Sequence, residues 1–121
     1  RENGRLGEHP ILTGGEGGKT VARVATYTGQ SLDGPPAATV LLRLPANAVE
    51  YIPAEPEFIA RPAGGAQGLA MEVGAGRVVV LGEAAMLTAQ VYRGEHFGLN
   101  APGHDNQQFA LNVLHWLAGR L

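Results

Sequence analysis

Imidazole and carboxylate side chains beside glycine and proline are the groups of this chain that could carry acid–base chemistry. Glu83 directly follows an apolar run and a glycine, His104 lies in a glycine-rich stretch, and His9 precedes a proline. A carboxylate and an imidazole that reach the same substrate can move protons to and from it. These three residues are therefore the candidate catalytic set of a hydrolase acting on a small polar or sugar-like substrate.

Each of these side chains also has an ordinary structural interpretation. Glu83 can be a solvated turn residue or cap a short helix that starts after it, and His9 can bond to loop backbone. His96 and His104 lie eight residues apart on an irregular segment, and Asp105 is expected to cap a helix. Because this spacing lacks the geometry of a ligand set, no metal and no cofactor are predicted.

Polar side chains at strand ends indicate a binding site without catalysis. Gln30 and Ser31 follow a predicted strand, and Asn100 lies in the loop predicted at residues 93–104. Open α/β sheets hold their ligands in the loops at strand ends. Together with Glu83, these residues form the predicted set for a small polar ligand, although turn chemistry explains Gln30 and Ser31 equally well.

Several catalytic classes are excluded by composition. The chain has no cysteine, which removes a thiolate nucleophile, disulfides and cysteine metal sites. Its only serine, Ser31, lacks the Gly-x-Ser-x-Gly surroundings of a serine hydrolase. The glycine-rich residues 13–18 lack the first glycine of a phosphate-binding P-loop. The favoured prediction is a non-catalytic ligand-binding or protein-interaction module.

Four stretches predict the strands that must position these residues. Residues 78–81 are an unbroken apolar run, which is typical of a central strand covered on both faces. Residues 67–73 alternate in polarity and are expected to pair with that run as an antiparallel hairpin through a turn at 74–76. Residues 20–28 are rich in β-branched side chains and residues 39–44 end at a proline, so both are predicted as strands.

A long C-terminal helix is predicted at residues 105–119. Its apolar side chains recur every three or four residues, and Asn112 is placed on the opposite, polar side. Asp105 and Gln108 are expected to form a capping box, and Gly119 to end the helix in a left-handed conformation. The predicted apolar stripe consists of Phe109, Ala110, Val113, Leu114 and Leu117.

The remaining segments predict less regular structure. Residues 9–12 are expected to be extended, because proline disfavours a helical residue before it. The proline-rich residues 45–65 favour an irregular or edge excursion. Residues 84–92 are predicted as a short helix and residues 93–104 as a loop. The predicted fold class is α/β, with a mixed sheet, a β-hairpin and a long C-terminal helix.

The order of several motifs carries a family resemblance. The motifs are His-Pro-Ile at 9–11, Gly-Arg-Val-Val-Val-Leu-Gly-Glu at 76–83, Met-Leu-Thr at 86–88, and Asp-Asn-x-x-Phe-Ala-Leu-Asn-x-x-x-Trp-Leu-Ala-Gly at 105–119. This order resembles the C-terminal portion of bacterial class I glutamine amidotransferase-like domains without glutaminase function. The resemblance implies a flavodoxin-like three-layer fold in which further elements precede residue 1. Residues 1–121 are then expected to be a single domain that forms the C-terminal portion of a larger one.

Composition narrows the choice of partners. Nine Lys and Arg residues are scattered along 121 residues with a formal charge of −2, so nucleic acid is not a predicted partner. No apolar run approaches the roughly 18 residues of a membrane span. The apolar residues 78–81 require more cover than the predicted helices supply, which predicts a missing N-terminal half-domain or a second copy as partner. A soluble domain of the cytoplasm or the periplasm fits equally well.

Overall fold

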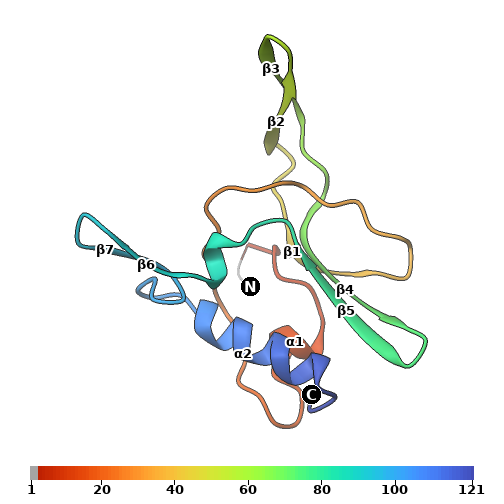
Figure 1. The fold of residues 1–121 in the computed structure, drawn as a ribbon. Coiled ribbons are helices and arrows are strands. Elements are labelled where there is room, and N and C mark those ends of the chain that lie inside the picture. Colours follow the sequence, from red (N-terminus) through yellow and green to blue (C-terminus); the bar gives the residue numbers. More distant parts are fainter. Residues whose placement is uncertain (1–2) are drawn as a thin grey trace.

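A computed structural model describes residues 3–121 of the chain. A three-stranded antiparallel sheet in the order β1-β4-β5 lies at its centre, and two separate two-stranded hairpins project from the body (Figure 1). The predicted α/β class with a β-hairpin and a long C-terminal helix is confirmed. The strands are β1 (Thr39–Arg43), β2 (Val49–Ala54), β3 (Glu57–Pro62), β4 (Ala66–Val73), β5 (Gly76–Leu81), β6 (Ala89–Tyr92) and β7 (Glu95–Gly98), and the helices are α1 (Pro10–Thr13), the short 3-10 helix η1 (Ala85–Leu87) and α2 (Asn106–Leu117).

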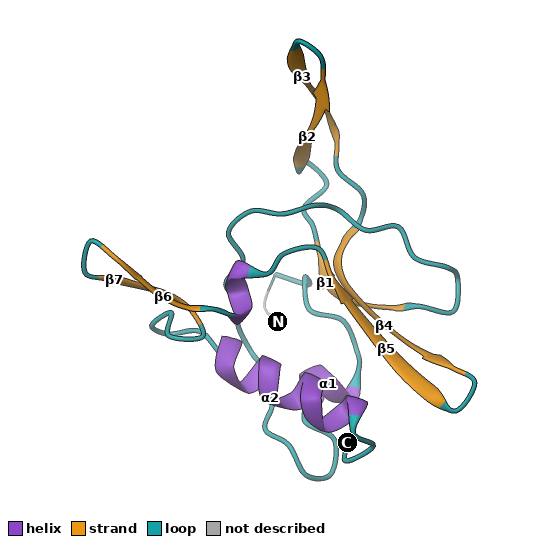
Figure 2. Cartoon of the chain, viewed as in Figure 1, coloured by secondary structure: helices purple, strands orange, loops and turns teal. Residues whose placement is uncertain are grey.

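The helices α1 and α2 contact each other and lie on one side of the central sheet (Figure 2). They share a single apolar core with the sheet, because amphipathic elements must bury their apolar faces against one another. The core residues come from α1, β1, β4, η1, α2 and the segment after α1, and they are Ile11, Leu12, Val21, Leu41, Leu42, Ala70, Met86, Phe109, Val113 and Trp116.

The hairpin predicted at residues 67–81 is confirmed, with Val73 paired to Gly76 across the turn. The prediction that its apolar second strand is central and covered on both faces is wrong. That strand, β5, lies at the edge of the sheet, and its Val78 and Val80 are 38% and 45% exposed. The central strand is β4, whose first five residues are all buried between β1 and β5. The predicted partner for the exposed face, a half-domain or a second copy, stays a prediction.

The C-terminal helix is confirmed, but its buried face differs from the predicted stripe. Leu114 and Leu117 are 61% and 42% exposed, whereas Asn106 and Asn112 are buried beside Phe109, Val113 and Trp116. Burial of the asparagines is satisfied by backbone bonds of their amide groups: Asn106 bonds to Ala25 and Met86, and Asn112 bonds to Ile11 and Lys19. The predicted end of the helix is confirmed, since Gly119 has φ +71° and its N–H donates to the Trp116 carbonyl.

The predicted capping box is absent from the start of α2. The Asp105 side chain makes no capping bond, and Gln108 donates instead to Asn112 within the helix, at 2.8 Å. Asp105 Oδ2 accepts hydrogen bonds from the N–H groups of Ala22 and Arg23, at 2.7 and 2.9 Å. The Asp105 carboxylate is therefore bonded to a backbone segment that is distant in the sequence, instead of capping α2.

That segment, residues 20–28, was predicted as a strand and forms none. We call it the strap. Its backbone bonds to side chains rather than to a neighbouring strand: besides the two bonds to Asp105, the N–H and carbonyl of Ala25 bond to the Asn106 amide, each at 2.8 Å. The strap takes no regular secondary structure, and it bonds to the start of α2 instead of pairing with a strand.

Three of the segments predicted as irregular are regular. Residues 10–13 form the one-turn helix α1, whereas His9 is extended, as predicted. Pro10 occupies the first helical turn, where a backbone N–H would have no partner within the helix, so the missing N–H of proline costs nothing there. Residues 45–65 contain the β2–β3 hairpin, and β7 lies within the predicted loop at 93–104. The short helix predicted at 84–92 is only η1, followed by β6. In each hairpin, the two strands pair and satisfy each other's backbone N–H and carbonyl groups. These segments are therefore regular, although their proline and glycine content predicted irregular structure.

Candidate ligand-binding site

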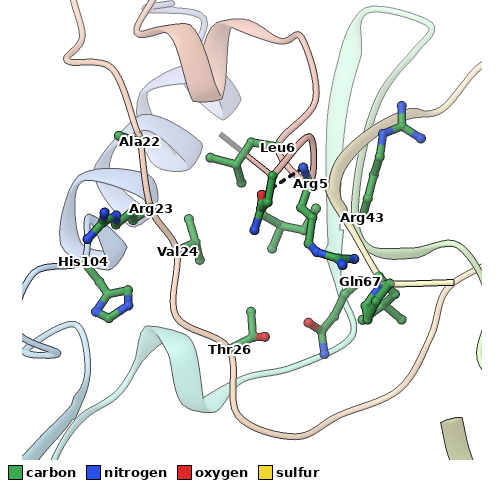
Figure 3. A pocket seen from close by; sticks show the side chains of 13 residues that line it. Arg5, Leu6, Ala22, Arg23, Val24, Thr26, Arg43, Gln67 and His104 are labelled. Carbon is green, nitrogen blue, oxygen red and sulfur yellow. Dashed lines mark hydrogen bonds between the residues drawn. The ribbon is translucent and has the colours of Figure 1, made fainter. Parts of the chain in front are cut away.

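A cavity of about 610 Å³ lies between the central sheet, the strap and the N-terminal segment (Figure 3). Its volume lies in the range of small-molecule sites. Its apolar lining comes from Leu6, Val24, Leu42, Leu44 and Pro45, and its polar and charged lining from Asn3, Arg5, Arg23, Thr26, Arg43, Gln67 and His104.

The lining is positively charged. Three arginines contribute to this charge, and none of the described lining residues is Asp or Glu. The two salt bridges found among residues 3–121 are Arg61 with Glu50 and Arg77 with Glu72, so neither involves a cavity arginine. Guanidinium groups that are not neutralised within the chain attract and bind anionic groups of a ligand.

The wall that carries Arg5 is built by pairing of the N-terminal segment with β1. Leu6 forms an isolated antiparallel bridge with Leu42, and the Arg43 N–H donates to the Arg5 carbonyl at 2.8 Å. Gln67 of β4 completes this wall. Its side chain is largely buried, and its amide donates to the Thr28 carbonyl at 3.3 Å.

The opposite wall is the strap, which the start of α2 holds in place. Besides the two bonds to the Asp105 carboxylate, the Asp105 N–H donates to the Arg23 carbonyl at 2.7 Å. Because His104 directly precedes Asp105, this pairing places His104 on the same wall as Arg23. The carboxylate of Asp105 is occupied by strap N–H groups and does not line the cavity.

The three cavity arginines were not identified from the sequence. They lie at positions 5, 23 and 43, and no motif links that spacing to a common site. Arg23 and Arg43 fall in segments predicted as strands, which does not show that they face one cavity. The Lys and Arg residues are scattered along the sequence, whereas folding gathers three of the arginines at one cavity.

The three candidate catalytic residues do not meet in this cavity. His104 lines it, with Nδ1 2.9 Å from the Pro102 carbonyl oxygen, whereas Glu83 and His9 are not among its lining residues. Glu83 is 5% exposed, and its two carboxylate oxygens accept from the Met86 N–H at 3.0 and 3.1 Å. Burial raises the pKa of Glu83. Glu83 is thus positioned to hold the start of η1.

His9 is half-buried against α2. Its Nδ1 accepts a hydrogen bond from the Ile11 N–H at 3.2 Å, which caps α1, and its ring makes an edge contact with Trp116 at 4.8 Å. Burial lowers the pKa of His9 and Arg77 lowers it further, while Glu72 acts in the opposite direction. The neutral imidazole is the form that accepts the capping bond.

We expect His9 to make the fold less stable in mild acid. Because its folded pKa lies below the unfolded value of about 6.5, the unfolded chain binds more protons between these two values. The free energy of unfolding should therefore fall as the pH drops below about 6.5. Urea unfolding followed by circular dichroism at pH 7.5 and pH 5.5 measures the change, and His9→Asn, which keeps a capping side chain, should reduce it. An unchanged pH dependence in His9→Asn would show that His9 does not contribute.

The predicted ligand-binding residues also lie outside the cavity lining. Ser31 Oγ donates to Glu50 Oε2 at 2.7 Å, and Arg61 Nε donates to Glu50 Oε1 at 2.6 Å, at the base of the β2–β3 hairpin. These bonds, first that from Ser31 and then that from Arg61, lower the pKa of Glu50. Gln30 and Asn100 are exposed on other parts of the surface.

Among residues 3–121, no three or more metal-ligating side chains form a group that could hold an ion. No helix in this part of the chain combines the length and the apolar character that crossing a bilayer requires.

Comparisons with protein-family models, with curated proteins and with solved structures find no match to this chain. The amidotransferase-like resemblance therefore stays a prediction from sequence motifs, and the function has to be argued from the cavity itself.

Proposed function

We propose that this protein is a non-catalytic binding module that takes a small anionic ligand in the arginine-lined cavity. The observation that carries the proposal is the composition of the lining, in which Arg5, Arg23 and Arg43 are present and no described residue is acidic. The rest of the lining combines apolar side chains with a few polar ones, which is the usual combination in sites that bind small molecules.

The positions of the catalytic candidates support binding rather than catalysis. A general base must lie within hydrogen-bonding reach of the bound substrate. Of the three candidates only His104 lines the cavity, and the hydroxyl of Ser31 is bonded to a carboxylate rather than to an imidazole. The hydrolase alternative lacks a carboxylate beside His104 in the described lining.

The wider setting is also a proposal. We infer that the module is the C-terminal portion of an amidotransferase-like domain and that another domain or a second copy covers its exposed apolar side chains. The exposed Val78 and Val80 of β5 support this, together with Tyr51 and Phe58 of the β2–β3 hairpin, which are 70% and 68% exposed.

Binding of inorganic phosphate tests the proposed site. We expect phosphate to bind with weak affinity and to shift the amide NMR signals of the cavity residues. Arg5→Met removes the charge and keeps an apolar stem, so it should weaken binding by about tenfold, the effect of losing roughly 1.4 kcal/mol of a charged hydrogen bond. Calorimetric titration measures the change.

Arg120→Met is the matched control, because Arg120 is exposed near the C-terminus and does not line the cavity. It should leave phosphate binding unchanged. Absence of phosphate binding, or equal weakening by both substitutions, would contradict the proposed site.

A further inference from the structure

The polarity of the cavity lining changes with burial. Its arginines are the more accessible part, since Arg23 and Arg43 are exposed and Arg5 is half-buried. The least exposed of the described lining residues is an apolar one, Leu42, with 5% of its surface accessible. Charge therefore lies mainly near the mouth of the cavity, and apolar surface lies deeper.

The deeper surface, which we call the apolar floor, consists of Leu6, Val24 and Leu42. It is continuous with the hydrophobic core, because Leu42 of β1 is a core residue and Leu6 and Val24 pack against the core. Leu6 belongs to the N-terminal segment and Val24 to the strap, so both walls of the cavity contribute to the floor (Figure 3). An apolar ligand group on this floor would contact side chains that the fold already holds in place.

A compact inorganic anion uses only part of this lining. It can bond to guanidinium groups, but it leaves the apolar floor facing the water of the cavity. A methylene group that is fully buried against such a floor raises the affinity roughly fourfold. The cavity volume of about 610 Å³ leaves room for an organic group beside the charged one.

Resting on the proposed function, we infer that the ligand is an amphiphilic organic anion, with an anionic head among the arginine side chains and an apolar group on the floor of Leu6, Val24 and Leu42. Guanidinium groups bond to the oxygens of a phosphate monoester and of a carboxylate alike. The two heads therefore share the recognition chemistry, and the experiment distinguishes them.

Two matched pairs of ligands test this inference: methyl phosphate with butyl phosphate, and acetate with pentanoate. Within each pair the head is the same, and the second ligand carries a butyl group in place of a methyl group. Calorimetric titration should find that the butyl ligand of at least one pair binds at least about tenfold more tightly, which is less than full burial of three further methylene groups would give. The pair that shows the gain identifies the head. Butanol, which has the apolar group without the charge, should bind at least about tenfold more weakly than that butyl anion.

Val24→Thr tests whether the apolar group lies on the floor. Threonine keeps the shape of valine but adds a hydroxyl, so it should reduce the advantage of butyl over methyl by roughly threefold and leave the affinity for the methyl ligand unchanged. Val91→Thr is the matched control, because Val91 is 59% exposed on β6 and does not line the cavity. It should leave both affinities unchanged. Thermal unfolding checks that each variant is folded, and the ligand pairs on the original chain decide the inference if Val24→Thr is not.

The outcomes separate this inference from the proposed function. If butyl and methyl ligands bind equally while Arg5→Met still weakens phosphate binding, the amphiphilic inference is overturned and the anion site stands. A folded Val24→Thr variant that keeps the full advantage of the butyl group would also overturn it, because the apolar group would then lie elsewhere. If butanol binds as tightly as the butyl anions, or if no anion binds, both proposals fail.

Discussion

Replacement of Asn112 by leucine is expected to destabilise the protein by roughly 2–6 kcal/mol, because the two carbonyl groups that accept from the Asn112 amide would each lose a bond worth about 1–3 kcal/mol. Asn112 is fully buried, and its amide donates to the carbonyls of Ile11 and Lys19, both at 2.8 Å. Leucine has the same branched set of side-chain heavy atoms and a larger volume, so the loss should come from unsatisfied polar groups and overpacking rather than from a cavity. The midpoint of urea unfolding, followed by circular dichroism, measures the effect.

The loss would be large for a domain of this size, since small domains are stable by only about 5–15 kcal/mol. Gln107→Leu is the matched control. It introduces the same side chain on the exposed face of the same helix and should change the stability by no more than about 0.5 kcal/mol. Similar losses in the two variants would indicate that leucine disturbs α2 itself, and that the tie between α2 and the N-terminal segment contributes little.

The second large effect is expected for Gly98→Ala, at the end of β7. Gly98 has φ +68°, and a Cβ atom there would lie 1.9 Å from the Thr88 carbonyl oxygen and 2.6 Å from that of Ala85. Both contacts are with backbone, so η1 or β7 would have to move. Left-handed strain of about 1–2 kcal/mol and overpacking of about 1–3 kcal/mol predict a total loss of roughly 2–5 kcal/mol. Thermal unfolding measures it.

Gly94→Ala separates the left-handed strain from the steric part of that loss. Gly94 also has a positive φ, +84°, but a Cβ atom there would meet nothing within 4 Å. Its substitution should therefore show the left-handed strain alone, about 1–2 kcal/mol. If Gly98→Ala were no more destabilising than Gly94→Ala, the close approach of β7 to η1 would not be a constraint on the fold.

Local patterns account for the elements that were predicted correctly. The α2 helix follows from apolar residues at helical spacing, and its left-handed end follows from Gly119. The β4–β5 hairpin follows from alternation on one strand, an apolar run on the other and glycines in the turn. Each of these features depends on residues close together in the sequence.

The position of an element within the fold was predicted less well. The apolar run of β5 indicated a central strand, but β4 occupies the centre because the chain places β1 on its other side. The strap was predicted as a strand from composition, yet its partners are Asp105 and Asn106, about 80 residues away in the sequence. Periodicity describes the side chains of a segment and carries no information about which distant groups will satisfy its backbone.

The sequence alone determined the fold class, the C-terminal helix, the β4–β5 hairpin and the absence of cysteine chemistry, since composition and short-range pattern are enough for these. Only the tertiary structure decided that Arg5, Arg23 and Arg43 line one cavity. The physical reason is that their convergence depends on long-range hydrogen bonds, from the N-terminal segment to β1 and from the strap to the start of α2.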